Sequence, residues 1–151
     1  MRFRSVNAAI KWALDTKSRD IVTTSRFGHV GGAELSAHEQ HAQAEFILLE
    51  VGKLPHQERM IVAIKFGAPR IELAMAMADA IGHCADRLVM DCVMAYQADQ
   101  PSIRAMSDKH KRSTGTIQAT RKRVFDKLDP IYRRAMAQME LRLADLIERA
   151  A

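Results

Sequence analysis

Apolar side chains recur every three or four residues through most of this 151-residue chain, and this is the period of an α-helix. Val6, Ala9, Ile10, Ala13 and Leu14 form one such stripe near the amino end. No strand-like alternation of apolar and polar residues runs longer than four residues. Glycine and proline are scarce, with seven and four residues, so few positions interrupt a helix. The sequence therefore predicts an all-α, multi-helix fold.

Capping residues predict where the first helices begin and end. Ser36 and Glu39 have the spacing of a capping box, which predicts a helix from Ala37 to Gly52. Residues 23–32 have no helical period and are predicted to form a loop. We therefore expect residues 1–33 to be an N-terminal helix with a flexible loop, and residues 34–151 to be a helical domain.

Prolines and glycines mark the later boundaries. Pro55 and Gly67 bracket a predicted helix, and Pro69 opens another. The inward residues of that helix are predicted to be Ile71, Ala74, Met75, Ala78 and Ile81. Asp129-Pro130 is predicted to end one helix and to begin a long C-terminal helix over residues 130–150. Apolar residues follow a short heptad pattern in that helix, which either folds back on the protein or makes a homodimer or polymerase contact.

The net charge of +5 is unevenly distributed. Residues 31–100 carry five basic and ten acidic side chains, whereas residues 101–151 carry twelve basic and six acidic ones. Such a concentrated positive field attracts polyanions, of which nucleic acid is the commonest in cells. A solvated basic helix face is the alternative explanation.

Two serines predict a pair of helices in the basic region. Ser102 is placed to cap a short helix that ends near His110, and Ser113 to cap a second one. The inward residues are predicted to be Ile103 and Met106 in the first helix, and Ile117, Val124, Phe125 and Leu128 in the second. A short helix, a tight polar turn and a basic capped helix indicate a helix-turn-helix.

Two segments resemble region 4 of bacterial sigma factors, the promoter-reading C-terminal domain. Residues 54–67 begin with Leu54-Pro55 and carry Glu58 and Phe66-Gly67 at the spacing of that family. Residues 102–128 match its next block, with these residues in register: Ser102, Ile103, Met106, Ser113, Ile117, Arg123, Val124, Phe125, Lys127 and Leu128. The resemblance implies a sigma-region-4-like helix-turn-helix that binds double-stranded DNA.

The chain departs from sigma factors between these two segments, because residues 68–101 form a predicted helical insertion. The family that combines such a helix-turn-helix with a chain of this size is the phage late-gene antitermination protein Q group with related prophage transcription regulators. Ile10-Lys11-Trp12-Ala13 is loosely similar to that group. The resemblance implies bacterial RNA polymerase as a further partner and the bacterial host cytoplasm as the location.

The second helix carries the candidate DNA-binding residues. Gln118 is suited to pair with an adenine, and Thr116 to contact a base edge or a thymine methyl group. The free amides at the start of this helix are suited to bind a phosphate, and the adjacent basic residues to contact phosphates. The full predicted set is Lys109, Lys111, Arg112, Ser113, Thr114, Gly115, Thr116, Gln118, Arg121, Lys122 and Arg123.

Other kinds of site find little support. Cys84 and Cys92 lie eight residues apart in a helical pattern, too far for one metal, so both are predicted to be core thiols. No phosphate loop, nucleophile elbow or carboxylate cluster occurs in the sequence. We expect no enzyme, no metal and no cofactor. Two cysteines, no apolar signal core and no apolar run of about eighteen residues favour a cytoplasmic protein with no membrane partner.

These observations predict a sequence-specific DNA-binding transcription regulator of the antitermination protein Q kind. Two alternatives stay open. The first is a phage DNA-packaging protein of the small-terminase type, which also uses a helix-turn-helix but forms rings. The second is a protein-interaction module whose basic face meets an acidic partner.

Overall fold

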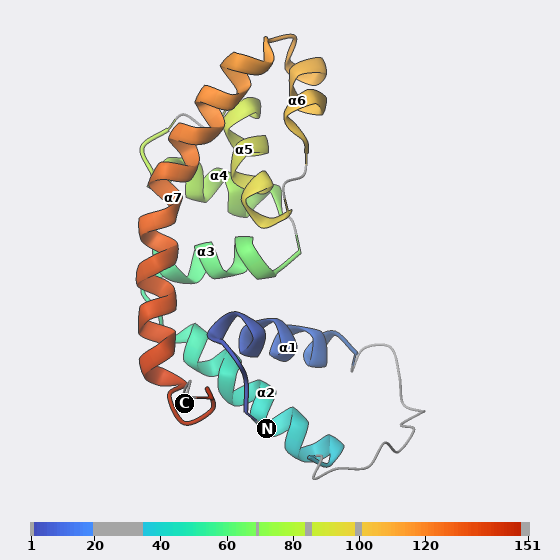
Figure 1. Ribbon diagram of the computed structural model, residues 1–151, viewed down its shortest axis with the longest axis vertical. Coiled ribbons are helices and arrows are strands. Elements are labelled where there is room, and N and C mark those ends of the chain that lie inside the picture. Colours follow the sequence, from blue (N-terminus) through green and yellow to red (C-terminus); the bar gives the residue numbers. More distant parts are fainter. Residues whose placement is uncertain (1, 20–34, 69, 84–85, 99–100, 149–151) are drawn as a thin grey trace. The chain divides into compact units, whose positions relative to one another are not determined.

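A computed structural model describes residues 2–19, 35–68, 70–83, 86–98 and 101–148. The predicted all-α fold is confirmed, because these residues form seven helices and no strand (Figure 1). None of the described helices is both long enough and apolar enough to cross a bilayer. The helices are α1 (Val6–Arg19), α2 (Ala37–Gly52), α3 (His56–Phe66), α4 (Ile71–Ala80), α5 (Arg87–Ala98), α6 (Ile103–His110) and α7 (Thr114–Arg142).

The helices divide into two compact units. The first unit comprises Met1–Leu54 and Met136–Ala151, and the second comprises Pro55–Ala135. The predicted loop within residues 1–33 falls on residues 20–33, which lie outside the described ones. The predicted domain division next to it stays a prediction.

In the first unit, α1 packs on α2 through most of the stripe that the sequence predicts. Ala9, Ile10 and Ala13 are fully buried, whereas Leu14 is half-buried. Phe3 precedes α1, and its ring lies 5.2 Å from that of Trp12. The backbone of Phe3 also pairs with the segment after α7, because its amide donates to the Leu146 carbonyl and its carbonyl accepts from the Glu148 amide, at 2.7 and 2.8 Å.

The predicted capping box at the start of α2 is confirmed. The Ser36 hydroxyl accepts from the Glu39 amide, and the Glu39 carboxylate accepts from the Ser36 amide at 2.7 Å. These hydrogen bonds from Ser36 hold the pKa of Glu39 below its ordinary value. The cap fixes the first turn of α2 where the chain enters it.

A buried carboxylate lies near the other end of α2. Glu50 is 7% exposed and is paired with Lys53 and with Arg142 of α7, whose Nη1 lies 3.2 Å from Glu50 Oε2. The pKa of Glu50 is lowered, first by the hydrogen bond from Lys53 and then by the one from Arg142. Both pairs require the ionised carboxylate.

Acid is therefore expected to destabilise the protein through Glu50. The ordinary pKa of this group is 4.5 and the folded value is lower, so its stabilising effect is complete above about pH 4.5 and is lost as the pH falls through the folded pKa. Glu50→Gln should lower the thermal midpoint at neutral pH and flatten its decline in acid, followed by circular dichroism. Glu45→Gln is the control, because Glu45 lies on the same helix in an exposed ion pair. An equal effect of both substitutions would contradict a special role of Glu50.

In the second unit, α3 begins after Pro55 and ends before Gly67, as the sequence predicts. Glu58 in its first turn is buried and accepts a hydrogen bond of 3.1 Å from the Arg134 guanidinium of α7. α3, α4 and α5 pack against one another around Ile61, Met77 and Val93, which are fully buried.

The predicted inward face of α4 is partly wrong. Ala74 and Ala78 are buried, but Ile71 and Met75 are 55% and 46% exposed, and Met77 is buried in their place. All residues of α4 except Glu72 and Asp79 are apolar. The apolar pattern of this helix therefore marks no single face, and contacts with α3 and α5 decide which side is buried.

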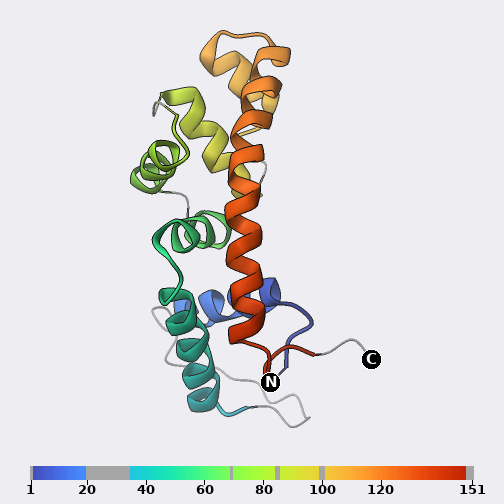
Figure 2. The ribbon, with the colours of Figure 1, turned by 90° about the vertical axis from the view of Figure 1, so that its left-hand side faces the viewer.

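The predicted helix break at Asp129-Pro130 is wrong, because α7 runs without interruption from Thr114 to Arg142 (Figure 2). The Asp129 carboxylate does not cap a new helix but accepts a hydrogen bond of 2.8 Å from the Tyr96 hydroxyl. Pro130 has no amide hydrogen to donate to the Asp126 carbonyl, four residues earlier. Both residues are exposed, so water can reach that carbonyl instead. Leu128 and Ile131 are buried on either side of Pro130 and hold the helix in place.

The predicted C-terminal helix over 130–150 is also too long, since α7 ends at Arg142. The predicted heptad residues are Tyr132, Met136, Met139, Leu143, Leu146 and Ala150. Of these, Met139 and Leu143 are buried within the first unit, and Ala150 lies outside the described residues. Leu141 is 82% exposed. The homodimer contact through residues 130–150 stays a prediction.

Candidate nucleic-acid interface

The candidate interface is built from α6, a three-residue turn and the first turns of α7 (Figure 1). Both predicted serine caps are present. Ser102 Oγ accepts from the Ala105 amide and Ser113 Oγ accepts from the Thr116 amide, each at 3.2 Å. These caps fix where α6 and α7 begin, as the sequence predicts.

Buried side chains set the orientation of α7. Ile117, Val124 and Leu128 are fully buried, and so is Met106 of α6. Phe125 is only half-buried, with its ring edge-on to Tyr96 at 5.1 Å between centroids. Because one stripe of α7 is held in this way, the opposite stripe faces solvent in the second unit.

The turn contains an uncommon backbone conformation. Lys111 has φ 54° and ψ 42°, and it is the only non-glycine residue with positive φ in the part of the chain that the structure describes. This left-handed conformation favours glycine and costs a lysine about 1 kcal/mol. Ser107 supports the turn, because its carbonyl accepts from the Arg112 amide and its hydroxyl donates to the Arg112 carbonyl.

The outward side of α7 carries most of the predicted DNA-binding residues that lie on this helix. Gln118 and Lys122 are exposed, one turn apart. Thr116 is exposed as well, although its hydroxyl already shares a hydrogen bond of 2.9 Å with that of Ser113. The space around Gly115 is open, so another molecule can approach the backbone closely there. The exposed members of the predicted set on α7 are Thr114, Gly115, Thr116, Gln118, Lys122 and Arg123.

Arg121 differs from its two basic neighbours. It is half-buried, and its guanidinium lies 5.0 Å from the centroid of the Phe125 ring. Arg121 therefore lies at the border of the core, whereas Lys122 and Arg123 are exposed. The stacking on Phe125 gives Arg121 a packing role that charge alone does not predict.

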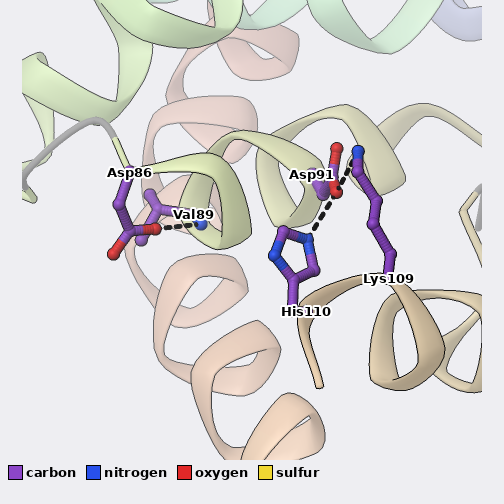
Figure 3. A network of polar contacts seen from close by, with 5 residues as sticks. All are labelled: Asp86, Val89, Asp91, Lys109 and His110. Atoms are coloured by element: carbon purple, nitrogen blue, oxygen red, sulfur yellow. Dashed lines mark hydrogen bonds and ion pairs between the residues drawn. The ribbon is translucent and has the colours of Figure 1, made fainter. Parts of the chain in front are cut away.

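Lys109 is held by a carboxylate that the sequence analysis did not single out. Asp91 of α5 is 8% exposed, and its Oδ2 lies 2.9 Å from Lys109 Nζ and 2.7 Å from His110 Nε2 (Figure 3). Asp91 precedes the buried Cys92 in the apolar stripe of α5. The only sign of this contact in the sequence was an acidic residue beside a buried stripe. That sign does not identify Lys109 and His110 as the partners of Asp91.

The exposed cations around the turn create a positive field. Lys111, Arg112, Lys122 and Arg123 are all exposed. The field also reaches His83, which follows α4. Burial lowers the pKa of His83, and the positive charges of Lys127 and Arg123 lower it further.

The charge of the outward stripe changes from positive to negative one turn after Lys122. Asp126 is exposed there and would repel a phosphate. The stretch of α7 suited to a polyanion therefore ends near Arg123.

Of the two cysteines, the structure describes Cys92 alone. Cys92 is fully buried, and burial raises the pKa of its thiol to about 11, so the prediction of a core thiol is confirmed for this residue. Cys84 lies outside the described residues. Among the residues that are described, no group of three metal-ligating side chains comes together.

Comparisons of the chain with protein-family models, with curated proteins and with solved structures found no match. The function must therefore be inferred from the contacts and charges described above.

Proposed function

We propose that the protein is a sequence-specific DNA-binding transcription regulator, and that α6, the turn and α7 act as its helix-turn-helix. The observation that carries this proposal is the outward stripe of α7. Small and polar side chains occupy its first turns, and exposed cations flank them on the turn and at Arg123. In this proposal the amino-terminal part of α7 enters the major groove.

The dimensions and chemistry of α7 fit that role. Residues 114–123 span roughly 15 Å at 1.5 Å per residue, comparable with a major groove about 12 Å wide. Gln118 offers both a donor and an acceptor to an adenine edge. Lys111 and Arg112 would contact phosphates, and the free amides after Ser113 would bind one more.

We further propose a sigma-region-4-like arrangement of the antitermination protein Q kind that acts with bacterial RNA polymerase. One feature supports it. Apart from Leu54, the two segments that resemble region 4 lie in one compact unit, as α3 and as α6 with the first half of α7. Residues 68–101, in which the chain departs from sigma factors, contribute α4 and α5 to the same unit.

The test is a binding selection from random duplexes, followed by titrations of the selected site over a series of salt concentrations. We expect affinity to fall steeply with salt, because bound phosphates release counterions. Gln118→Ala should weaken binding to the selected site by about tenfold and leave binding to random DNA unchanged, since it removes a base contact and no charge. Gln138→Ala is the control on the same helix, in the first unit.

Three outcomes would contradict the proposal. Binding that is absent or insensitive to salt would favour a protein-interaction module, to be tested by a nuclease-treated pull-down with an acidic partner. A large ring seen by light scattering would favour a packaging protein. A selection that returns no preferred sequence would exclude sequence-specific regulation.

A further inference from the structure

Asp91 joins the middle of α5 to the end of α6. Its Oδ2 accepts from Lys109 Nζ at 2.9 Å and from His110 Nε2 at 2.7 Å (Figure 3). Asp86, the other carboxylate shown there, has a local role, because it accepts from the Val89 amide at 2.8 Å. Among the described residues, Asp91 is the carboxylate that links α5 to the residues just before the turn.

The two partners of Asp91 differ in exposure. The side chain of His110 is 11% exposed, whereas that of Lys109 is 58% exposed. A buried carboxylate requires a hydrogen-bond partner, and His110 supplies one away from water. The Lys109 ammonium lies mostly in water, where an ion pair is weak and a competing anion can exchange with it.

Lys109 lies two residues before the exposed cations of the turn, Lys111 and Arg112. Its stem is long enough to turn its ammonium either towards α5 or towards solvent. In the structure it is turned towards α5 and its charge is neutralised by Asp91. The candidate interface therefore has one cation fewer than the sequence suggests.

We propose that Asp91 competes with DNA for Lys109, and thereby keeps one phosphate contact out of the interface. This inference rests on the proposed DNA-binding function. Asp91 is then a positioning residue for the interface: it holds His110 at the end of α6 and withholds Lys109 from the phosphate backbone. Its carboxylate sets the number of phosphates that the turn neutralises.

The test is Asp91→Asn in the full chain, with binding to a fluorescein-labelled duplex measured by anisotropy between about 50 and 200 mM salt. The amide keeps the size of the side chain and an acceptor oxygen but removes the charge. We expect affinity at physiological salt to rise about twofold to fivefold, and the slope of log K against log salt to steepen by about 0.9, the value for one added phosphate contact. A purely structural role of Asp91 would not steepen that slope.

Two further variants assign the change to Lys109. Lys109→Gln alone should leave the slope unchanged, and in the Asp91→Asn background it should cancel the gain. Asp108→Asn is the matched control, because Asp108 is an exposed acid on α6 and its replacement changes the net charge equally. We expect that control to leave the slope unchanged.

Several results would overturn the inference. These are an unchanged or shallower slope in Asp91→Asn, an equal gain in Asp108→Asn, or a gain that survives the loss of Lys109. Should Asp91→Asn fail to fold, Lys109→Gln alone decides, because a slope shallower by about 0.9 would mean that Lys109 already contacts a phosphate. A wild-type chain that binds no duplex would overturn the proposed function together with this inference, whereas the results above would leave the proposed function intact.

Discussion

Replacing Lys122 and Arg123 together by glutamate is expected to reduce the affinity of the chain for duplex DNA by at least about a hundredfold at physiological salt. Both side chains are exposed on α7, where Lys122 lies one turn after Gln118 on the proposed groove-facing side and Arg123 flanks that side. The substitution removes two phosphate contacts and adds two charges that repel phosphates. Because neither side chain is buried, the thermal midpoint should change little. Salt titrations should also show a slope shallower by about 1.8.

The control for this pair changes the net charge equally at another place. Arg2 and Lys11 are exposed residues of the first unit, and Arg2→Glu with Lys11→Glu gives the same charge difference. We expect this variant to bind DNA within a few fold of the wild type, because neither residue belongs to the proposed interface. An equal loss in both variants would mean that net charge, and not the face of α7, attracts DNA.

Replacing Pro130 by alanine is expected to stabilise the protein by about 2 kcal/mol. A proline inside a helix costs about 3 kcal/mol, because it removes one hydrogen bond and its ring crowds the preceding turn. About 1 kcal/mol of that gain is offset, since alanine leaves the unfolded chain more freedom. Pro130 is exposed, so the smaller side chain leaves no cavity. Urea unfolding followed by circular dichroism measures the change.

Pro55→Ala is the control, because Pro55 is the N-cap residue of α3, where a missing amide breaks no helical bond. We expect that variant to be slightly less stable than the wild type. A Pro130→Ala variant that is no more stable than the wild type would mean that α7 bends or opens at this proline in solution.

Local signals in the sequence were sufficient for much of the fold. The Ser36–Glu39 capping box and the Ser102 and Ser113 caps involve residues three apart, so the sequence alone specifies them. The buried stripe of α7 was predicted for the same reason, since its period places Ile117, Val124 and Leu128 on one side.

Contacts between distant residues explain the errors. A proline beside an aspartate is typical of a helix start, but Leu128 and Ile131 are buried on both sides of it and the helix continues. α4 is apolar on nearly every side, so only its neighbours determine that Met77 is buried and Ile71 exposed.

In the candidate interface, too, local patterns could be predicted from the sequence, whereas contacts between distant residues could not. The sequence placed Gln118 and Lys122 on the outward side because that depends on the helical period alone. It did not separate Arg121 from Lys122, since the ring of Phe125 one turn away decides where the guanidinium lies. It also gave no indication that Asp91, eighteen residues before Lys109, neutralises that lysine.

The pairing of Phe3 with residues 146–148 has a practical consequence for handling the protein. Clipping the first few residues would leave the Leu146 carbonyl and the Glu148 amide without their partners, and would uncover one face of Trp12. Loss of the residues around Phe3 would therefore destabilise the segment over residues 146–148, although the two segments are far apart in sequence. Affinity tags are best joined through a spacer, and proteolysed samples checked by mass before any binding measurement.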